Sequence, residues 1–427
     1  MAISLSRITG RAQTQPVPPK PANDQATPAA IRRAFKASAI PESIPLTPLT
    51  GVGTARQRFD VQMTGLVYMF RILVHAKITV TAGAAGDCTW SNTGPWSLFS
   101  NAFFSDSVGI PRIDCAPFYL HLRRLLYQNF GLNVKGSTVD ATNTQPLDPT
   151  PVYQAPLLTS GPGTVNDVYF WWDMPLTVHA DDLQGLVDLS TPGRRATLGV
   201  TISPAGLAAA AGVLDDTVPI NIKAASAATV ALTSIKIMAQ QYLYGLQGVV
   251  SGKIIDLPIP QADMDVIHEI ATKTKTGLST SATGTFEQLD INRTYISAIQ
   301  SWYFNSQMTL GQLDGITNRP DAGLTAIPKG LLNVWMKYSG NKKPIDEPLA
   351  SYLPLLYDKY GRNMPAGTTW WDWRRKPWNS DWVDIIQIGG QLDPGAATTG
   401  QTFLDTTTEG LYTGTTSDTI GTVGATT

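Results

Sequence analysis

The sequence predicts a mostly β protein built from two tandem copies of one domain, and three observations carry this prediction. Two heptapeptides nearly repeat, Leu-Leu-Tyr-Gln-Asn-Phe-Gly at 125–131 and Leu-Leu-Tyr-Asp-Lys-Tyr-Gly at 355–361. The word Trp-Trp-Asp follows each of them, at 171–173 and 370–372. Both halves are also rich in Thr, Ser, Gly and Pro and lack long amphipathic stretches of Glu, Lys and Leu. A repeat of this length is a whole domain used twice rather than a solenoid unit.

Two weaker matches extend the repeat in the same chain order. The run 111–114 (Pro-Arg-Ile-Asp) has an echo at 344–346 (Pro-Ile-Asp). The run 182–189 falls on 381–388 and keeps the first Asp and the apolar positions. The spacing between the heptapeptide and Trp-Trp-Asp is longer in the first half, which indicates a loop insertion there. Matches in a constant order favour duplication over chance.

Composition limits the classes of protein that the chain can belong to. Its 427 residues suffice for two or three domains, and its charged content of 15% is low against a hydrophobic content of 43%. Two cysteines, Cys88 and Cys115, are too few for a disulfide framework and are expected as free thiols. No signal peptide and no run of 18 apolar residues are visible. We therefore expect a soluble protein made in a reducing cytoplasm.

Residues 1–58 are predicted to form an extended, basic, Pro- and Ala-rich arm. They carry eight basic and two acidic side chains, a net charge of +6, which leaves −7 on the rest of a chain with a formal net charge of −1. Residues 28–40 have the pattern of one short, weakly amphipathic helix. Two roles remain open for the arm: docking on a neighbouring subunit, or contact with anionic lipid or a nucleic-acid surface. The candidate contact residues are Arg7, Arg11, Arg32, Arg33, Phe35 and Lys36.

The rest of the chain divides into two β domains, each with one helix. The predicted divisions are a first β domain at 59–245, a linker at 246–263, and a second β domain at 264–427 with a loose Gly- and Thr-rich tail from 410. The helices are expected at 117–131 and 348–361, where Leu spacing is helical and a Gly follows at the carboxyl end.

A search for catalytic and ligand-binding patterns finds no convincing site. The four histidines are scattered and give no zinc spacing. The run 248–253 resembles a phosphate-binding loop, but it is one residue short and has no Ser or Thr after its Lys. No Gly-x-Ser-x-Gly elbow is present. We expect no enzymatic activity, no cofactor and no metal site.

Tryptophans are concentrated near the second Trp-Trp-Asp word, and basic residues are interleaved with them at 374–376. One interpretation is stacking on nucleic-acid bases. The other is packing at a domain or subunit interface, where Trp and Arg are enriched. The repeat favours packing, because no basic run follows the first Trp-Trp-Asp. The candidate interface or inter-barrel residues are Trp171, Trp172, Trp370, Trp371, Trp373, Trp378 and Trp382.

Short strands interrupted by one helix per domain fit the jelly roll, which has eight strands in two Greek-key sheets. At this level the chain resembles the double jelly-roll major capsid proteins of tectivirus-like membrane-containing phages, hexon-type adenovirus coats and related archaeal virus coats. The resemblance covers about 59–410. It rests on Asn92–Phe99, the hairpin at Ser107–Pro111, the helix ending at Gly131, and Asp181–Leu189. The Pro-rich arm is longer than this family leads one to expect.

The resemblance implies two tandem eight-stranded jelly-roll barrels in one chain and a structural role in a virion. Its implications continue to a homotrimer shaped as a pseudo-hexagonal tile, which paves an icosahedral shell over an internal lipid membrane. The implied partners are further copies of the chain, penton, vertex and minor capsid proteins, and membrane lipid contacted by the arm, with no sequence-specific nucleic acid. The implied source is a double-stranded DNA bacteriophage and the implied location is the capsid.

Two other interpretations remain open at this stage. One is a β-rich carbohydrate- or receptor-binding module that uses the tryptophans of 370–382 as platforms. The other is a single jelly-roll coat or vertex protein whose halves are unrelated. Superposable halves would exclude the second of these.

Overall fold

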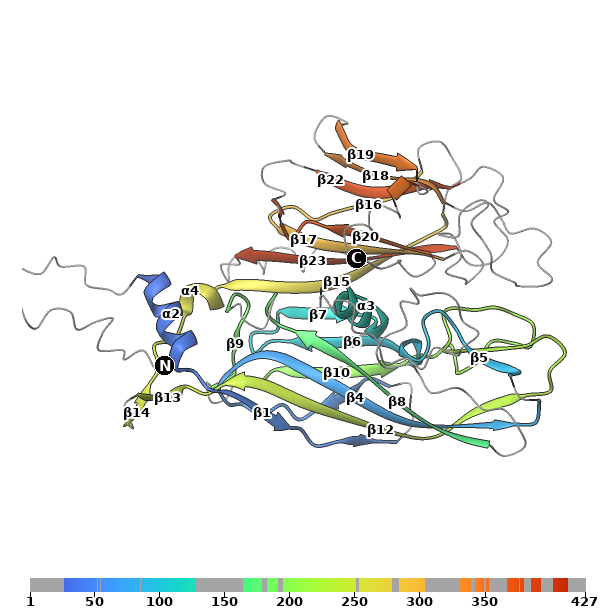
Figure 1. Cartoon of the computed structure of the whole chain (residues 1–427), viewed down its shortest axis with the longest axis horizontal. Coiled ribbons are helices and arrows are strands. Elements are labelled where there is room, and N and C mark those ends of the chain that lie inside the picture. Colours follow the sequence, from blue (N-terminus) through green and yellow to red (C-terminus); the bar gives the residue numbers. More distant parts are fainter. Residues whose placement is uncertain are drawn as a thin grey trace, which may run out of the picture.

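The computed structural model describes residues 27–51, 53, 55–84, 86–127, 164–178, 183–190, 195–250, 253–278, 284–303, 331–338, 342–348, 351–352, 367–375, 377–379, 385–392 and 402–413. Over these residues the chain forms two stacked units (Figure 1), the first drawn mainly in blue to green and the second in yellow to red. Each unit consists of two β layers that enclose a hydrophobic core.

The outer layer of the first unit has the strand order β1-β12-β4-β8. Its strands are β1 (Pro41–Pro45), β12 (Thr229–Tyr244), β4 (Leu66–Thr81) and β8 (Thr164–Pro175), and the short strands β2 (Leu49–Thr50) and β9 (Val187–Asp188) pair with β12 and β4. We call this layer sheet A. The outer layer of the second unit has the order β16-β22-β18-β19, with β16 (Thr285–Gln288), β22 (Ile386–Leu392), β18 (Leu331–Tyr338) and β19 (Lys342–Pro348).

A nine-stranded sheet supplies the inner layer of both units and joins them. In the first unit it contains β7 (Pro111–Cys115), β6 (Phe99–Ser105), β10 (Thr197–Ile202) and β3 (Gln57–Phe59). In the second unit it contains β20 (Thr368–Asp372), β17 (Thr294–Tyr303), β23 (Phe403–Thr413), β15 (Val266–Thr276) and, beside β17, β21 (Trp378–Asn379). The join is a short parallel pairing in which Ile270 and Ala271 of β15 lie opposite Ile113 and Asp114 of β7.

The remaining elements lie around these layers. β5 (Cys88–Trp90) pairs with β11 (Ile220–Ile222), and β13 (Gln247–Val250) forms a hairpin with β14 (Lys253–Asp256). Within the described part of the chain, the labelled helices are α2 (Pro28–Ser38), the 3-10 helix η1 (Trp96–Leu98), α3 (Pro117–Tyr127) and α4 (Gln261–Met264). Figure 1 shows α3 between the two units, and α2, α4, β13 and β14 together at one end of the molecule.

The two units have the same topology, which confirms the predicted duplication. We number the four main strands of each layer in chain order. Starting from the first strand (β1, β3, β15 or β16), every layer then has the spatial order first, fourth, second, third. The Trp-Trp-Asp words lie on equivalent strands, since β8 pairs with β4 as β20 pairs with β17. The weaker echo of 111–114 at 344–346 is also correct, because β7 and β19 are equivalent.

One proposed match in the repeat is wrong. Residues 182–189 contain β9, which pairs with β4, whereas 381–388 lead into β22, which pairs with β18 in the opposite layer. The true counterpart of β22 is β10. The described residues of both segments are mostly apolar and lead into short strands, so the segments look alike in sequence although they lie in different layers.

Burial alternates along the long strands, as expected where one face of a strand covers a core. In β4 the side chains of Phe70, Ile72 and Val74 point into the first core, where Trp172 joins them. In the second unit the core includes Trp302, Val334, Met336 and Trp371. Runs of β-branched and aromatic residues at 59–81, 230–244 and 331–337 favour strands in the sequence, and β4, β12 and β18 occupy most of these runs, whereas no such run predicts β15, β19 and β23.

The predicted arm and linker need correction. The first unit begins before residue 59, because β1 pairs with β12 from Pro41 opposite Tyr244 to Pro45 opposite Gln240. The predicted linker at 246–263 contains the β13–β14 hairpin and most of α4. The carboxyl-terminal tail is ordered as β23 as far as Thr413, beyond its predicted start at 410. Most of the second expected helix, 353–361, lies outside the described residues.

Helix α3 packs one side against the first unit. His121 is 3% exposed, and its ring stacks on Trp96 with centroids 3.6 Å apart. Burial, reinforced by the positive charge of Arg124, lowers the pKa of His121 to about 3. The neutral ring therefore belongs to the folded state, whereas an unfolded chain binds a proton on this side chain below about pH 6.5.

We predict that His121→Phe makes the protein less sensitive to acid. Because the folded-state pKa of His121 is depressed, its proton binds preferentially to the unfolded chain, and stability is lost as the pH falls from about 6.5 toward 3. Phenylalanine retains the aromatic stack and removes this proton. The slope of the free energy of unfolding against pH, from urea titrations at pH 4.5 to 7, should fall by up to about 1.4 kcal/mol per pH unit. An unchanged slope would show that His121 titrates alike in both states.

Candidate functional site: the contact between the two units

Three side chains of α3 reach across to the second unit. Tyr119, Arg123 and Tyr127 are spaced four residues apart, so they lie along one face of the helix. The Tyr119 hydroxyl donates to the Asp405 carboxylate of β23 at 3.0 Å. Arg123 and Tyr127, which lie one and two turns after Tyr119 in α3, both bind Glu409 of the same strand. One helix face of the first unit is thus bonded to one strand of the second.

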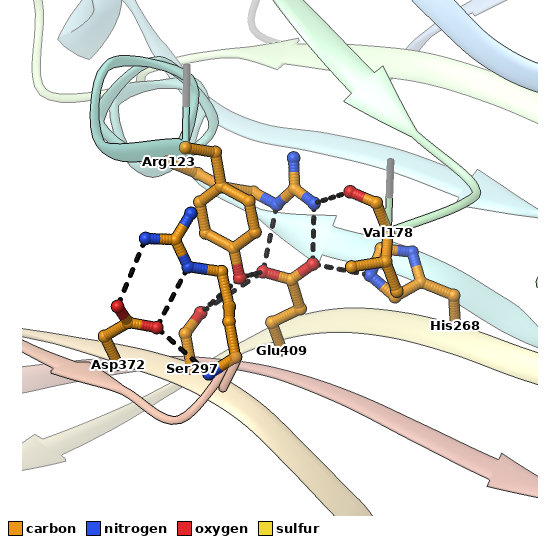
Figure 2. Close-up of polar contacts among 8 residues, drawn as sticks. Arg123, Val178, His268, Ser297, Asp372 and Glu409 are labelled. Atoms are coloured by element: carbon orange, nitrogen blue, oxygen red, sulfur yellow. Dashed lines mark hydrogen bonds and ion pairs between the residues drawn. The ribbon is translucent and has the colours of Figure 1, made fainter. Parts of the chain in front are cut away.

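Glu409 is the centre of this contact (Figure 2). The Nε of Arg123 donates to Oε2 of Glu409 at 3.0 Å, and its Nη2 donates to Oε1 at 2.6 Å, a bidentate pair. His268 Nε2 lies 2.7 Å from Oε1, and the Ser297 hydroxyl donates to Oε2 at 3.2 Å. The Tyr127 hydroxyl also bonds to Oε2 and lies 2.9 Å from the Ser297 hydroxyl.

This carboxylate is charged although it is only 2% exposed. Burial alone would raise its pKa, but the charge of Arg123 and the hydrogen bond and charge of His268 outweigh burial and hold the pKa of Glu409 well below its ordinary value. Arg123 is held in its cationic form by the same partner, since Glu409 raises the pKa of Arg123 against the effect of burial. The Nη2 of Arg123 also donates to the backbone carbonyl of Val178, at 3.0 Å.

Tyr127 lies between two guanidinium groups. The Cζ of Arg123 is 4.2 Å from the centroid of its ring, and the Cζ of Arg374 is 4.4 Å from it. Arg374 is held by Asp372, to which its Nε donates at 2.9 Å, and also lies 5.1 Å from the Trp370 ring. Cation–π attraction of this kind is strongest where water is excluded. Tyr127 therefore connects the buried ion pair to the second Trp-Trp-Asp word.

The structure separates the predicted tryptophans into different environments. Trp370 is 0% exposed and lies at the contact between units, 6.3 Å from Tyr127 between ring centroids. Trp171 is partly exposed on the outer face of sheet A. Trp172, Trp371 and Trp373 are buried inside the cores of their own units, which corrects their assignment to an interface. Trp378 is partly exposed beside Tyr338, and Trp382 lies outside the described residues.

The predicted arm residues also divide. Phe35 is 0% exposed and packs against Tyr244 with ring centroids 5.5 Å apart. The Nε of Arg32 donates to Asp263 at 2.9 Å. Both side chains therefore fix α2 to the chain itself. For the buried Phe35 this corrects its assignment as an external contact, whereas the Arg32 side chain is still 41% exposed and its assignment stays a prediction. Arg33 and Lys36 are exposed on α2, while Arg7 and Arg11 lie outside the described residues.

The network at Glu409 was missed by sequence reasoning. Glu409 follows a run of threonines next to a Gly, a composition that resembles a loose tail. Arg123 and Arg124 lie inside the helix predicted at 117–131, and that prediction assigns them no role. The available signal was spacing: Tyr119, Arg123 and Tyr127 recur at every fourth position and make one polar stripe on a helix whose other positions are apolar except for His121 and Arg124.

The arrangement binds and positions but has no open reactive group. Every Glu409 partner named above is itself buried or part-buried. Within the part of the chain that the structure describes, no group of three or more His, Cys, Asp or Glu side chains could hold a metal ion. Among the described helices, none is long and apolar enough to cross a bilayer. The two cysteines are free and buried.

A double-mutant cycle at Arg123 and Glu409 is predicted to show strong coupling. Arg123→Met leaves the carboxylate buried without its main partner and should lower the free energy of unfolding by about 3–5 kcal/mol. Glu409→Gln should be similarly harmful, whereas the double variant should lose less than the sum of both losses by more than about 1 kcal/mol. Urea unfolding measures each value.

The matched control is the exposed pair Lys343–Asp346, whose atoms are 2.6 Å apart. Lys343→Ala should cost less than about 1 kcal/mol, because exposed pairs are screened by water. Additive losses at Arg123 and Glu409 would contradict the assignment of this pair as the contact that joins the units.

Comparison with known proteins gives a result at the level of structure only. No family model and no curated protein matches the sequence. The crystal structure of the STIV major capsid protein matches with a TM-score of 0.57 at 9% identity, covering 90% of this chain and 99% of that one. A chain of the atomic structure of Sulfolobus Turreted Icosahedral Virus matches with a TM-score of 0.57 at 10% identity, covering 88% and 91%. PBCV-1 VP54, fitted into a reconstruction of the virophage Sputnik, matches with a TM-score of 0.51 at 13% identity, covering 87% and 93%. The chain therefore has the double jelly-roll fold of these viral capsid proteins.

Proposed function

We propose that this chain is a major capsid protein that assembles as a homotrimer, and that the trimers tile an icosahedral shell. The observation that carries the proposal is the repetition of one eight-stranded topology in two units that are fixed to each other. Three such chains present six similar units around one axis, which approximates a hexagon. Hexagonal tiles cover flat facets, and many modest contacts summed over a lattice hold the shell together.

The proposed role is structural and not enzymatic. The polar groups around Glu409 hydrogen-bond to one another, and the described residues include no cluster that could hold a metal ion. The proposed location is the virion capsid, after synthesis in a host cytoplasm. The proposed partners are further copies of the chain, vertex and minor capsid proteins, and the lipid of an internal membrane.

The burial of the tryptophans argues against the carbohydrate-binding alternative. A sugar platform requires an exposed aromatic face, but Trp370, Trp371 and Trp373 are 0%, 1% and 6% exposed. Trp378 is partly exposed on a two-residue strand and has Tyr338 beside it. The described tryptophans of this region thus support packing.

The mass of the purified protein tests the proposed assembly. Light scattering after size exclusion should give three times the 46.0 kDa chain mass, and negative-stain images should show hexagonal particles. Higher concentration or crowding agents should promote sheets or shells. A protein that remains a monomer at every concentration would contradict the trimer.

The membrane part of the proposal predicts binding to anionic vesicles through the arm. Arg33 and Lys36 are exposed on α2, and each basic residue near an anionic surface contributes about 1 kcal/mol. The double variant R33E/K36E should weaken co-flotation with vesicles that contain phosphatidylserine by at least about 30-fold, a factor that corresponds to the loss of both contributions.

The matched control is K223E/K275E, which makes the same change of charge at exposed lysines elsewhere on the two units. It should bind the vesicles as the unmodified protein does. Equal loss in both variants would assign binding to net charge and not to α2, and no loss in either would overturn the membrane role of α2.

A further inference from the structure

The outer face of sheet A has a counterpart inside the chain. In the first unit Leu73 lies opposite Trp171 on one side and Met238 on the other. In the second unit Ile299 lies opposite Trp370 and Thr407 in the same geometry. The register gives these equivalent pairs: Trp171 and Trp370, Leu73 and Ile299, Met238 and Thr407, Arg71 and Ser297, Gln240 and Glu409, Asp173 and Asp372.

Both faces carry an arginine that is held by the Asp of Trp-Trp-Asp and lies near its first Trp. In the first unit Arg71 Nε donates to Asp173 at 2.7 Å, and its Cζ is 4.6 Å from the Trp171 ring. In the second unit the corresponding arginine is Arg374, described above, although it comes from a different position in the chain. The same Trp–Arg–Asp arrangement has therefore been built twice.

The two faces differ in what covers them. In the second unit Trp370, Ile299 and Thr407 are 0%, 4% and 5% exposed, because α3 of the first unit lies on this face. In the first unit Trp171, Leu73 and Met238 are partly exposed, although Arg124 stacks on the Trp171 ring at 3.3 Å. Tyr169, two residues before Trp171 on β8, is 47% exposed, while its counterpart Thr368 is 2% exposed.

We propose that the outer face of sheet A around Trp171, Leu73 and Met238 is the surface on which the second unit of a neighbouring copy docks. This inference rests on the proposed homotrimer and assigns its interface. Within one chain, α3 of the first unit packs on the second unit. In the equivalent contact between chains, the second unit of one copy packs on the first unit of the next copy. The two contacts therefore alternate around a ring that closes after three chains.

The sequence repeat names the segment of the neighbour that occupies the face. Tyr127 is the side chain that meets Arg374 and Trp370, and it ends the word Leu-Leu-Tyr at 125–127. The same word recurs at 355–357, which lies outside the described residues and is assigned here by sequence alone. Tyr357 of one copy is thus the expected partner of Arg71 and Trp171 of the next, where a guanidinium is already positioned to receive an aromatic ring.

Two single variants and their mixture test this assignment. Met238→Glu places a charge on the docking face, and Tyr357→Glu places one on the segment that docks. Each variant alone should lose the trimer entirely, at a concentration where the unmodified chain is trimeric. Mixed in equal amounts, they should form a dimer of twice the 46.0 kDa chain mass, because one intact face meets one intact segment. The control is Val213→Glu, at a half-exposed valine before β11, which should remain a trimer.

Near-ultraviolet circular dichroism and thermal melting of each variant separate loss of assembly from loss of folding, and Leu73→Glu replaces Met238→Glu if the latter unfolds. If the unmodified chain is a monomer, the proposed trimer itself is wrong. If the unmodified chain and the folded Met238→Glu and Leu73→Glu variants are all trimers, the trimer stands and this docking face is wrong. If both single variants are monomers and their mixture stays monomeric, the two surfaces do not meet and the pairing is overturned.

Discussion

The buried charge of Glu409 constrains how the two units are placed. An ionised carboxylate removed from water is costly unless it is paired and fully hydrogen-bonded. Its partners come from α3 in the first unit and from β15 and β17 in the second, so all are satisfied in one relative position only. The pair is therefore better understood as fixing geometry than as adding stability, because a buried ion pair often contributes little net free energy over an apolar replacement.

That constraint matters because the sheet alone joins the units weakly. The parallel pairing of β15 with β7 involves two residue pairs, so it is a short seam between two otherwise separate layers. Contacts of α3 with β23 at Asp405 and Glu409 lie beside this seam and prevent it from acting as a hinge. A chain whose two similar units cannot rotate against each other behaves as one rigid body, which suits the proposed role as a tile of a regular lattice.

The sequence predicted strand positions correctly where a motif is specific, and it was misleading where only a hydrophobic pattern was available. Trp-Trp-Asp located β8 and β20 correctly, since two tryptophans before an aspartate rarely recur by chance. The match of 182–189 to 381–388 failed, because any short buried strand gives a similar apolar pattern. Strand β23 and Glu409 were missed for a physical reason. This strand is covered on both faces by packed elements and satisfies its threonines by hydrogen bonds, as Thr407 does with Thr272 at 2.7 Å, so no alternation of apolar and polar residues marks it.

The differences between the equivalent faces follow from when each is covered. The face at Glu409 is covered as the chain folds, so it can hold a carboxylate that water never reaches. In the proposed trimer, the face at Trp171 has to be stable in water before assembly and in contact with another chain afterwards. Its counterpart of Glu409 is Gln240, an uncharged side chain that accepts a hydrogen bond from Tyr242 at 2.9 Å, and its arginine is already paired with Asp173. Leu73 and Met238 add apolar surface without any unsatisfied polar atom. Duplication explains why both faces have the same strand arrangement. The face at Glu409, which packs on its own chain, holds a buried charge, whereas the face at Trp171, which is proposed to pack on another chain, has neutral or internally paired groups instead.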